Sequence, residues 1–462
     1  MLILYNSLTR RLEAFKTIKK GKVGLYTCGP TVYHYAHIGN LRAYISSDIL
    51  KRALTYNGYK VKHVMNITDV GHLTSDADEG EDKMEKGAKR EGKTAWDIAN
   101  FYIVAFEKDL TDLNILFPTI WCRATDHIKQ QIKLIKKLEK KGFTYKTADG
   151  IYFDTSKLPD YGKLANLKNQ ELRAGARVGI GDKKNITDFA LWKFSPKIEQ
   201  RQMEWSSPWG IGFPGWHIEC SAMSTEYLGQ PFDIHTGGID HIPVHHTNEI
   251  AQSEAAEGKP LANYWLHNEF LLTGADKMSK SADNFTTLQI LQTQNYNPLA
   301  YRYLLLQTHY RKQLNFSTES LTAAANGLKH LYEEAQKIKN KKSEIKDNEI
   351  ETKFLDAIND DLNIPQALAI IWEAINKNEI NYKILLKFDN ILGLNIKENV
   401  EKLEKEPTIT DDVQKLLDLR KNARNEKNWP ESDRLRDEIK KLGWDVEDTK
   451  SGQIITRVTS KT

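Results

Sequence analysis

A strand–helix–strand pattern near the N-terminus constrains the fold of this chain more than any other feature. Residues 22–28 form a short apolar run that ends at a Gly-Pro breaker. Between residues 37 and 56, apolar side chains recur every three or four positions, and residues 60–67 form a second apolar run. Such a unit joins two parallel strands through a right-handed crossover. It predicts an α/β fold with a parallel, Rossmann-type sheet, whose ligands bind beyond the carboxyl ends of the strands.

The pattern becomes irregular at 116–205, apart from a lysine-rich helix near 128–141. Short apolar runs and helices then return up to residue 270. We therefore expect an insertion that separates two halves of the parallel sheet, at 1–115 and 206–270.

The second part of the chain is predicted to be mainly helical. Residues 271–318 contain a polar loop with two lysines, and long helical patterns follow at 319–346 and 349–377. The C-terminal part is predicted to contain helices at 411–427 and 433–442 and strands around 444–447 and 453–458. The last three predicted domains are thus 271–318, a helical bundle at 319–400, and a small mixed α/β domain at 401–462.

The charge of the chain is nearly balanced, with 66 Lys and Arg residues against 62 Asp and Glu residues among 462 residues. This excludes a uniformly basic coat, so local patches would have to meet any polyanionic partner. Three cysteines, far apart, argue against a disulfide framework and for a reducing compartment. The N-terminus lacks a signal-peptide layout, and no uncharged apolar run approaches the length of a membrane span. We expect a soluble, cytoplasmic protein.

Histidines are concentrated in one segment: five of the 13 lie between His217 and His246, close to Cys220. His245 and Glu249 are four residues apart, so on a helix they share one face and can contact one metal ion. Cys220 is a plausible third ligand. Buried cysteines and histidines are more often ordinary core residues, however, so this pattern alone leaves a metal site and a packed core both open.

Two short polar segments are typical of phosphate chemistry. His37-Ile-Gly-Asn40 stands at a predicted helix start, where unpaired backbone N–H groups favour an anion. Lys277-Met-Ser-Lys-Ser281 places two ammonium groups on a loop, where they could stabilise charge that develops at a phosphate. Each segment alone is equally compatible with an ordinary helix start or a solvated turn.

Together, the spacing of these signals resembles that of class I aminoacyl-tRNA synthetases, with 37–40 in place of the "HIGH" signature and 277–281 in place of "KMSKS". The chain resembles the cysteinyl-tRNA synthetase family more closely, over essentially its full length. The runs that carry this resemblance are Tyr26–Tyr33, Asn66–Asp69, Pro214–Met223, Phe232–His235, His245–Gln252, Lys277–Ser281, Asp360–Leu368 and Trp429–Asp448.

The resemblance implies a ligase that activates L-cysteine with ATP to cysteinyl-adenylate and pyrophosphate, and then transfers cysteine to the 3′ end of tRNA(Cys). Mg²⁺ would accompany the ATP. One zinc ion per subunit would select cysteine through its thiolate, held by Cys28, Cys220, His245 and Glu249. The resemblance also implies that 271–318 is the KMSKS-bearing stem-contact region, that 319–400 binds tRNA and that 401–462 binds the anticodon, in a chain expected to be a monomer.

The same resemblance assigns roles to individual residues. The catalytic residues would be His37, Asn40, Lys277 and Lys280; ATP would be bound by His37, Gly39, Asn40, Asp240 and Lys280; the substrate by Gly29, Thr68, Trp216 and His235; and tRNA by Arg424, Trp429 and Asp433. Cys122 has no role in this assignment and is interpreted as an ordinary buried thiol.

Among the departures from the family's pattern, which include Val244 and Thr247 beside the predicted metal ligands, one matters for the chemistry. The second signature histidine is replaced by Asn40, whose amide can donate a hydrogen bond to phosphate but cannot carry a positive charge. Loss of a charge-assisted bond would cost about 1–2 kcal/mol of transition-state stabilisation, roughly tenfold or somewhat more in rate. We expect either lowered activity or compensation by another base such as Arg42.

Two other functions are considered. A cysteine ligase of mycothiol synthesis would use the same zinc and adenylate chemistry to acylate an amino-sugar, but such an enzyme lacks the extended C-terminal region present here. A catalytically silent tRNA-binding or zinc-regulatory relative is suggested only by Asn40, and the complete lysine loop and ligand set argue against it.

Overall fold

The computed structural model describes residues 1–71, 82–166, 183–196, 201–273, 276–277, 285–341, 348–405, 411–449 and 452–457. These residues form two compact units, Met1–Lys397 and Glu398–Thr462. Among the described helices, none combines the length and apolarity that crossing a membrane requires.

The first unit is built on a parallel sheet of five strands in the order β12-β11-β3-β4-β5. The predicted βαβ unit is confirmed, since α1 (Ile38–Tyr56) connects β3 (Lys22–Thr27) to its parallel neighbour β4 (Lys60–Ile67). The remaining strands are β5 (Ile120–Arg123), β11 (Phe232–Gly238) and β12 (Ala262–Asn268). β3 and β11 are central to the sheet and their last residues are buried, which places their carboxyl ends inside the molecule.

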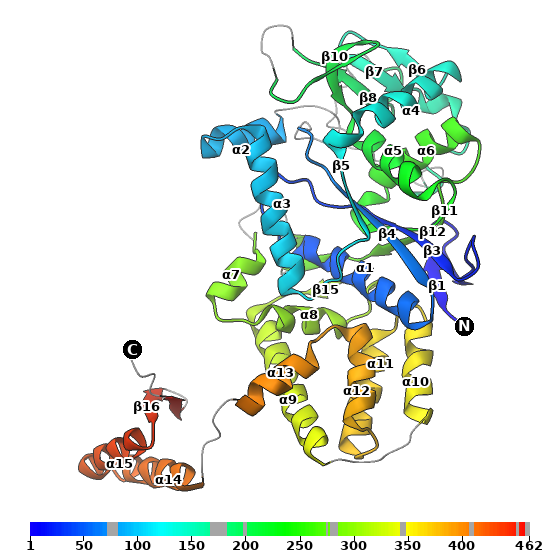
Figure 1. Ribbon diagram of the computed structural model, residues 1–462. Coiled ribbons are helices and arrows are strands. Elements are labelled where there is room, and N and C mark those ends of the chain that lie inside the picture. The colour runs from blue at the N-terminus through cyan, green and yellow to red at the C-terminus, as the bar shows by residue number, and fades with distance from the viewer. Residues whose placement is uncertain are drawn as a thin grey trace. The chain divides into compact units, whose positions relative to one another are not determined.

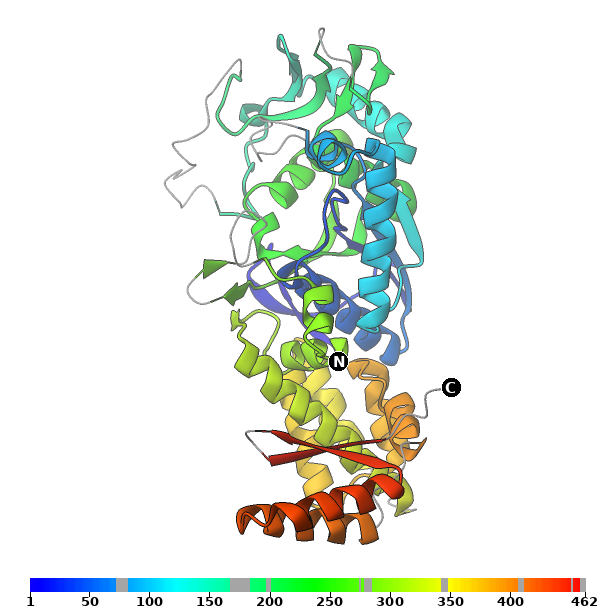
Figure 2. The same ribbon diagram turned by 90° about the vertical axis from the view of Figure 1, so that its left-hand side faces the viewer.

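Helices cover both faces of this sheet. α1 packs on β4, β11 and β12. α5 (Trp216–Leu228) packs on β3 and β4, and α6 (His245–Glu257) packs on α5. Figure 1 shows α5 and α6 above the strands and α1 below them. Two further helices, α2 (Lys83–Glu91) and α3 (Ala95–Asp112), follow β4, and α3 stands beside β5 in Figure 2. A hairpin of β1 (Ile3–Asn6) and β2 (Arg11–Ala14) begins the chain.

The region between the two halves of the sheet contains a second, antiparallel sheet in the order β6-β7-β8-β10-β9. The lysine-rich helix is present as α4 (Ile128–Lys140). The irregular pattern at 116–205 did not predict β7 and β8, because β7 and most of β8 are buried on both faces and so lack the alternation of a half-buried strand. β10 also belongs to this sheet, although residues 206–270 were expected to form the second half of the parallel sheet. The strands are β6 (Thr144–Lys146), β7 (Gly150–Phe153), β8 (Phe189–Phe194), β9 (Trp205–Ser207) and β10 (Gly210–Pro214).

A small sheet and a group of helices complete the first unit. β13 (Leu271–Thr273) pairs with β14 (Asp276–Lys277) and with β15 (Leu314–Asn315). The helices that follow β14 are α7 (Leu288–Thr293), α8 (Pro298–Leu306), α9 (Thr318–Asn340), α10 (Asn348–Asn359), α11 (Ile364–Asn376), α12 (Tyr382–Leu392) and α13 (Ile396–Lys405), of which α13 crosses into the second unit.

The helical pattern at 349–377 proves to be two helices and not one. Asp361 and Leu362 have positive φ angles of 53° and 56°, which end α10, and the side chain of Asn363 caps α11. The spacing of the apolar residues continues across this break, so periodicity alone predicts one continuous helix.

The second unit contains the two helices and the strand pair predicted for the C-terminal part. α14 (Asp411–Asn425) and α15 (Trp429–Lys441) pack against a hairpin of β16 (Trp444–Thr449) and β17 (Gly452–Arg457). α15 begins four residues earlier than expected, because Asn428 caps it and Pro430 occupies a first-turn position, where proline is tolerated. The buried core of this unit is formed by Val413, Leu417, Ile439 and Val446.

Candidate active site

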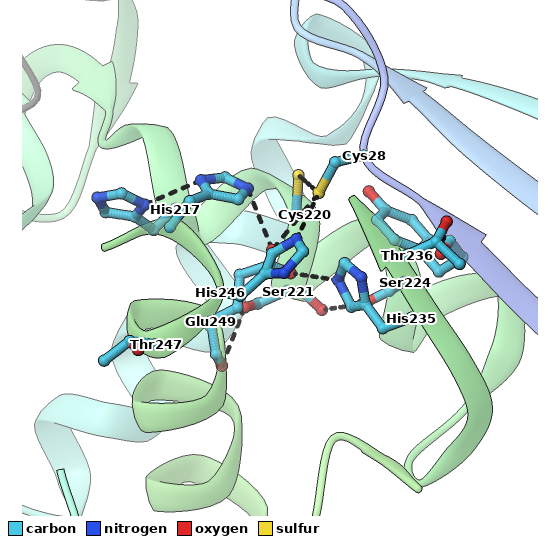
Figure 3. Close-up of polar contacts among 12 residues, drawn as sticks. Cys28, His217, Cys220, Ser221, Ser224, His235, Thr236, His246, Thr247 and Glu249 are labelled. Atoms are coloured by element: carbon cyan, nitrogen blue, oxygen red, sulfur yellow. Dashed lines mark hydrogen bonds and ion pairs between the residues drawn. The ribbon is translucent and has the colours of Figure 1, made fainter. Parts of the chain in front are cut away.

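Four side chains of types that can ligate a metal ion meet beyond the carboxyl end of β3. Cys28 directly follows β3, Cys220 lies on α5, and His245 and Glu249 occupy one face of α6. Their ligand atoms all lie within 4.8 Å of one another, and all four residues are buried. These are the four residues that the sequence resemblance had grouped. Figure 3 shows both thiols beside Glu249.

The distances within this group, which we call the metal group, suit one shared ion. The two Sγ atoms are 4.0 Å apart, and Cys28 Sγ lies 3.7 Å from Oε1 of Glu249. His245 Nε2 lies 3.1 Å from the same oxygen. Two thiols, an imidazole and a carboxylate are donors that Zn²⁺ accepts in proteins, so the residues present fit a metal ion.

The electrostatics of the metal group favour a positive charge at its centre. Burial alone would raise the pKa of Cys220, but its contacts with Cys28 and His245 lower that pKa to about 7. Burial would also lower the pKa of His245, yet Glu249 and Cys220 raise it to about 10. His235 and His245 outweigh burial and hold the pKa of Glu249 well below its usual range. Burial, together with Cys220 and Glu249, raises the pKa of Cys28, so this thiol and the His245 imidazolium would give up their protons only when a cation binds.

A second set of potential ligands overlaps the metal group, because His235 and His246 also lie within ligand distance of Cys28 and Glu249. His235 Nε2 lies 3.1 Å from Oε2 of Glu249, and its ring stacks on Trp265 at 4.4 Å. His246 Nδ1 lies 2.7 Å from His267 Nε2. Neither His235 nor His246 lines the adjoining cavity, whereas Cys28, Cys220 and His245 do. A metal that must meet a ligand from the cavity is therefore best held by the metal group.

The cavity has a volume of about 560 Å³ and runs from the metal group to the start of α1. The ring of Trp216 lies 4.5 Å from that of His245, at the metal end. Of the residues assigned to substrate or ATP from the sequence, His235 lies outside the lining and Lys280 lies outside the described residues. The other assigned residues line the cavity: Gly29, His37, Gly39, Asn40, Thr68, Trp216 and Asp240.

Gly29 is required where the chain leaves β3. A Cβ atom at this position would lie 1.7 Å from the carbonyl oxygen of Asn66, and the Gly29 N–H donates to the Asn66 side chain at 2.7 Å. Only glycine permits this approach. It brings the ends of β3 and β4 together at the floor of the cavity, beside Thr68.

The start of α1 forms the other end of the cavity. His37 is the N-cap residue, and its Nδ1 accepts a hydrogen bond from the backbone N–H of Asn40 at 3.1 Å. The remaining N–H groups of a first helical turn have no partner within the helix, so they can bind phosphate oxygens. The Ile38 N–H donates to the carbonyl of Thr286 at 2.9 Å, which ties this turn to the chain that follows the lysine segment.

Arg42 is not available to replace the missing signature histidine. Its side chain is buried, and its guanidinium donates to the backbone carbonyls of Phe270 and Lys312. It does not line the cavity. The expectation that Arg42 compensates for Asn40 is therefore wrong, because its guanidinium already donates to these two carbonyls. Both acceptors are far away in the sequence, so no local pattern reveals them.

The lysine segment is described only in part. The backbone of Lys277 belongs to β14, but its side chain and the whole of Lys280 lie outside the described residues. Phe285 resumes the described chain, and its ring lies 5.8 Å from that of His37.

The residues assigned to tRNA lie in the second unit. The guanidinium of Arg424 lies 5.3 Å from the ring centre of Trp429, whose surface is 52% exposed. Arg424 also pairs with Asp448 at 3.0 Å, as do Arg420 and Arg436 at 2.8 and 3.4 Å. Asp433 lies 3.5 Å from Arg436. Sequence reasoning did not single out Asp448, because no local spacing indicates that three arginines converge on it.

Sequence reasoning also missed aromatic and histidine residues in the cavity wall. His34, Tyr44, Tyr102 and Phe106 all line it. The helical spacing of Tyr102 and Phe106 marks one face of α3, but it could not indicate that this face borders a cavity and not only the core.

Family comparisons agree with this geometry. Residues 14–326 match the class I (C) tRNA synthetase catalytic domain, and residues 406–455 match the cysteinyl-tRNA ligase anticodon binding domain. The chain is 54% identical to a cysteine–tRNA ligase 1 of Burkholderia lata, over 98% of this chain and 96% of that protein. It is 46% identical to a cysteine–tRNA ligase of Treponema denticola, over 97% of this chain and 98% of that protein.

Solved structures show the same fold at low sequence identity. A methionyl-tRNA synthetase of Mycobacterium tuberculosis, in complex with methionyl-adenylate, aligns with a TM-score of 0.56 and 17% identity over 89% of this chain and 96% of that chain. A leucyl-tRNA synthetase of Agrobacterium radiobacter aligns with a TM-score of 0.57 and 12% identity over 84% of this chain and 86% of that chain. At such identities the likeness concerns the fold alone.

Proposed function

The chain belongs to the class I cysteinyl-tRNA synthetases and is a cysteine–tRNA ligase, and we propose that the cavity between the metal group and α1 is where it activates L-cysteine with ATP. The observation that carries this proposal is the position of the metal group at one end of the cavity and of a helix N-terminus at the other. The first suits a thiol and the second a phosphate.

Cys28, Cys220, His245 and Glu249 would hold a zinc ion. When bound, zinc supplies a soft Lewis-acid centre that binds a thiolate far better than an alcohol. Such a centre matters for selection, because an apolar pocket rejects a near-isostere that carries a hydroxyl by only ~10²-fold. With a metal-based selection of cysteine over serine, a separate editing site is not needed.

The other residues of the cavity would bind and orient the substrates. Trp216 forms a flat wall beside the metal group, where it would pack on the amino acid, while Gly29 and Thr68 line the floor. His235 lies behind Glu249, so its contribution to substrate binding would be to orient that carboxylate. Asp240, on the η4 turn Ile239–His241, lines the cavity and would bind the nucleotide.

Activation joins the cysteine carboxylate to the α-phosphorus of ATP and releases pyrophosphate. The Nε2 of His37, the N–H of Gly39 and the side-chain amide of Asn40 would donate to the phosphates, and Lys277 and Lys280 would balance the charge that develops there, with Mg²⁺ accompanying the ATP. Because little covalent chemistry is required of the protein, positioning and charge stabilisation account for the rate.

In the second step, a ribose hydroxyl at the 3′ end of tRNA(Cys) would attack the carbonyl carbon of the cysteinyl-adenylate, which forms the ester and releases AMP. Arg424, Trp429 and Asp433 would select the tRNA at its anticodon. An exposed tryptophan with a guanidinium at its face suits the stacking of unpaired bases, and the carboxylate can accept hydrogen bonds from base edges.

Two assays test the proposed function. Cysteine-dependent ATP–pyrophosphate exchange should be present in the purified protein, and cysteine should be transferred to tRNA(Cys). Exchange without tRNA charging, but with acylation of an amino-sugar, would instead support the sugar ligase. That alternative is disfavoured because residues 406–455 match an anticodon binding domain. Absence of exchange would support a silent relative.

A further inference from the structure

The backbone of Lys277 belongs to a very small sheet. β13 has three residues, and its partners β14 and β15 have two residues each. Lys277 lies opposite Leu272 of β13, and the residues just before it, Phe270 and Leu271, line the cavity. A sheet this short has too little buried surface to hold its own position. Whatever fixes β13 therefore also sets where the backbone of Lys277 lies relative to the cavity.

Arg42 contacts this small sheet where β13 and β15 begin. Its guanidinium donates through Nη1 to the carbonyl of Phe270, the residue before β13, and through Nη2 to the carbonyl of Lys312, two residues before β15. The two strands are parallel, so both contacts lie at the same end of the sheet. The planar fork of an arginine presents its donors in fixed directions and can bind two acceptors at once. Arg42 thus ties the two strands to each other and to α1.

The helix that carries Arg42 also forms the phosphate end of the cavity. α1 begins after the N-cap His37, and Arg42 lies two residues after Asn40, in the second turn. The same helix packs on β13. One rigid element therefore offers donors to the phosphates with its first turn and holds the small sheet with a side chain of its second turn.

A buried guanidinium is a costly means of holding two strands. Arg42 is 2% exposed, and two backbone carbonyls accept from it. Burial lowers the pKa of Arg42, and Glu269 and Tyr301 oppose this shift only in part. An apolar side chain of similar volume would pack at less cost. Packing alone therefore does not account for an arginine at this position, whereas the contact with two carbonyls does.

We propose that Arg42 is a positioning residue for cysteine activation, which holds the β13–β14 pair, and with it Lys277, in place relative to the start of α1. This inference rests on the proposed function, since it requires Lys277 to act at the ATP phosphates. Arg42 does not line the cavity, so it acts through the strands and not on the substrate. Its removal should weaken the contribution of Lys277 and leave the metal group unaffected.

The test is cysteine-dependent ATP–pyrophosphate exchange by the full chain, with kcat and KM measured for both substrates. Arg42→Met keeps an unbranched side chain but removes both donors, and it should lower kcat by roughly ten- to a hundredfold, the cost of a misplaced group. The KM for cysteine and the zinc content should not change. Arg42→Lys keeps the charge but offers one nitrogen in place of two, so it should lose activity to a lesser extent.

A double-mutant cycle with Lys277→Ala separates positioning from a general loss of stability. If Arg42 acts through Lys277, Arg42→Met should cost less than about twofold in the Lys277→Ala background, because the group that it positions is gone. A general weakening of the fold would instead cost the same factor in both backgrounds. If Arg42→Met does not fold, Arg42→Lys takes its place in the cycle.

Arg52→Met is the matched control. Arg52 also lies on α1 and is 7% exposed, and its guanidinium donates to the carbonyls of Asn390 and Asn114 at 3.0 and 2.7 Å and to Asp48 at 2.8 Å. These acceptors lie outside the small sheet, and Arg52 does not line the cavity. Arg52→Met should lower the melting temperature, as Arg42→Met does, but its effect on kcat should be the same in both backgrounds.

The outcomes are distinct. Full activity of Arg42→Met or Arg42→Lys, equal losses from Arg42→Met in the two backgrounds, or full activity of Lys277→Ala would overturn the role of Arg42 while leaving cysteine activation at this cavity intact. No exchange in the unsubstituted protein would overturn the proposed function, and the role of Arg42 with it.

Discussion

The two ends of the cavity are built in different ways. At the metal end, four buried side chains from β3, α5 and α6 contact one another, and each has a specific chemical role. At the phosphate end, the start of α1 offers the Gly39 N–H and the side chains at positions 37 and 40, which act as hydrogen-bond donors, a role that several residue types can fill. Side-chain identity should therefore be decisive at the metal end and more replaceable at the phosphate end. This difference explains how the family's ligand set can be complete while one signature histidine is exchanged for Asn40.

The largest effect is expected from Cys220→Ser. Serine is a poor ligand for a soft metal, so the variant should lose stoichiometric zinc and reduce cysteine activation by more than about a hundredfold. Metal content by elemental analysis and ATP–pyrophosphate exchange measure both effects. Cys122→Ser is the matched control, since Cys122 is equally buried but outside the metal group. A Cys220→Ser protein that retained one zinc per chain would contradict the conclusion that the identity of the side chains is decisive at the metal end.

Removal of the metal from the unsubstituted protein should change selectivity as well as rate. Without the metal, discrimination between cysteine and serine should fall to roughly 10²-fold or less, the limit for a pocket that rejects a hydroxyl by packing alone. Exchange assays with both amino acids, before and after chelation and again after zinc is restored, provide the measurement. If the apoprotein still preferred cysteine by orders of magnitude more, selection would not reside at the metal end.

A smaller effect is expected from His235→Ala, which removes the partner of Glu249 without removing a ligand of the metal group. Outer partners of this kind typically change metal affinity by about 10–100-fold. Competition with a chelator measures the affinity. His63→Ala, a buried histidine on β4 that contacts Thr27 and not the metal group, serves as the control. Unaltered zinc affinity in His235→Ala would show that the contact with His235 is not needed to orient Glu249 for the metal.

The smallest effect is expected from Asn40→His alone. With the Gly39 N–H and the lysines of the 277–281 segment available to the phosphates, the restored signature should change kcat for exchange by less than about threefold, or below ~0.7 kcal/mol. Steady-state kinetics with saturating cysteine would measure it. A rise of tenfold or more would mean that the phosphate end depends on the side chain at position 40 as strictly as the metal end depends on Cys220.

Sequence patterns predicted these two ends unequally. Spacing on one helix face placed His245 beside Glu249, and the βαβ periodicity placed Cys28 and the 37–40 segment at the same edge of the sheet. The grouping of Cys28 with Cys220 came from the family resemblance alone. Local patterns could not show that Arg42 is bound by the carbonyls of Phe270 and Lys312, because these acceptors are more than two hundred positions away in sequence.

The same limit applies to the fold. In the inserted sheet, β7 and most of β8 lack alternation because both of their faces are buried. The break between α10 and α11 depends on two positive φ angles that the apolar period does not reveal. Periodicity reports which face of an element is buried. It does not report what covers that face or where the backbone turns.

The hydrogen bond from the Ile38 N–H to the Thr286 carbonyl has a consequence for mutagenesis. It joins the start of α1 to residue 286 through peptide groups, so side-chain substitutions in either stretch leave it untouched. Ile38 is the first residue of α1, a position where proline is well accepted by a helix. Ile38→Pro would keep a helical backbone at this position and remove the N–H that donates to Thr286, but it would also remove a side chain that is 0% exposed, so its effect must be compared with that of Ile38→Ala, which keeps the N–H.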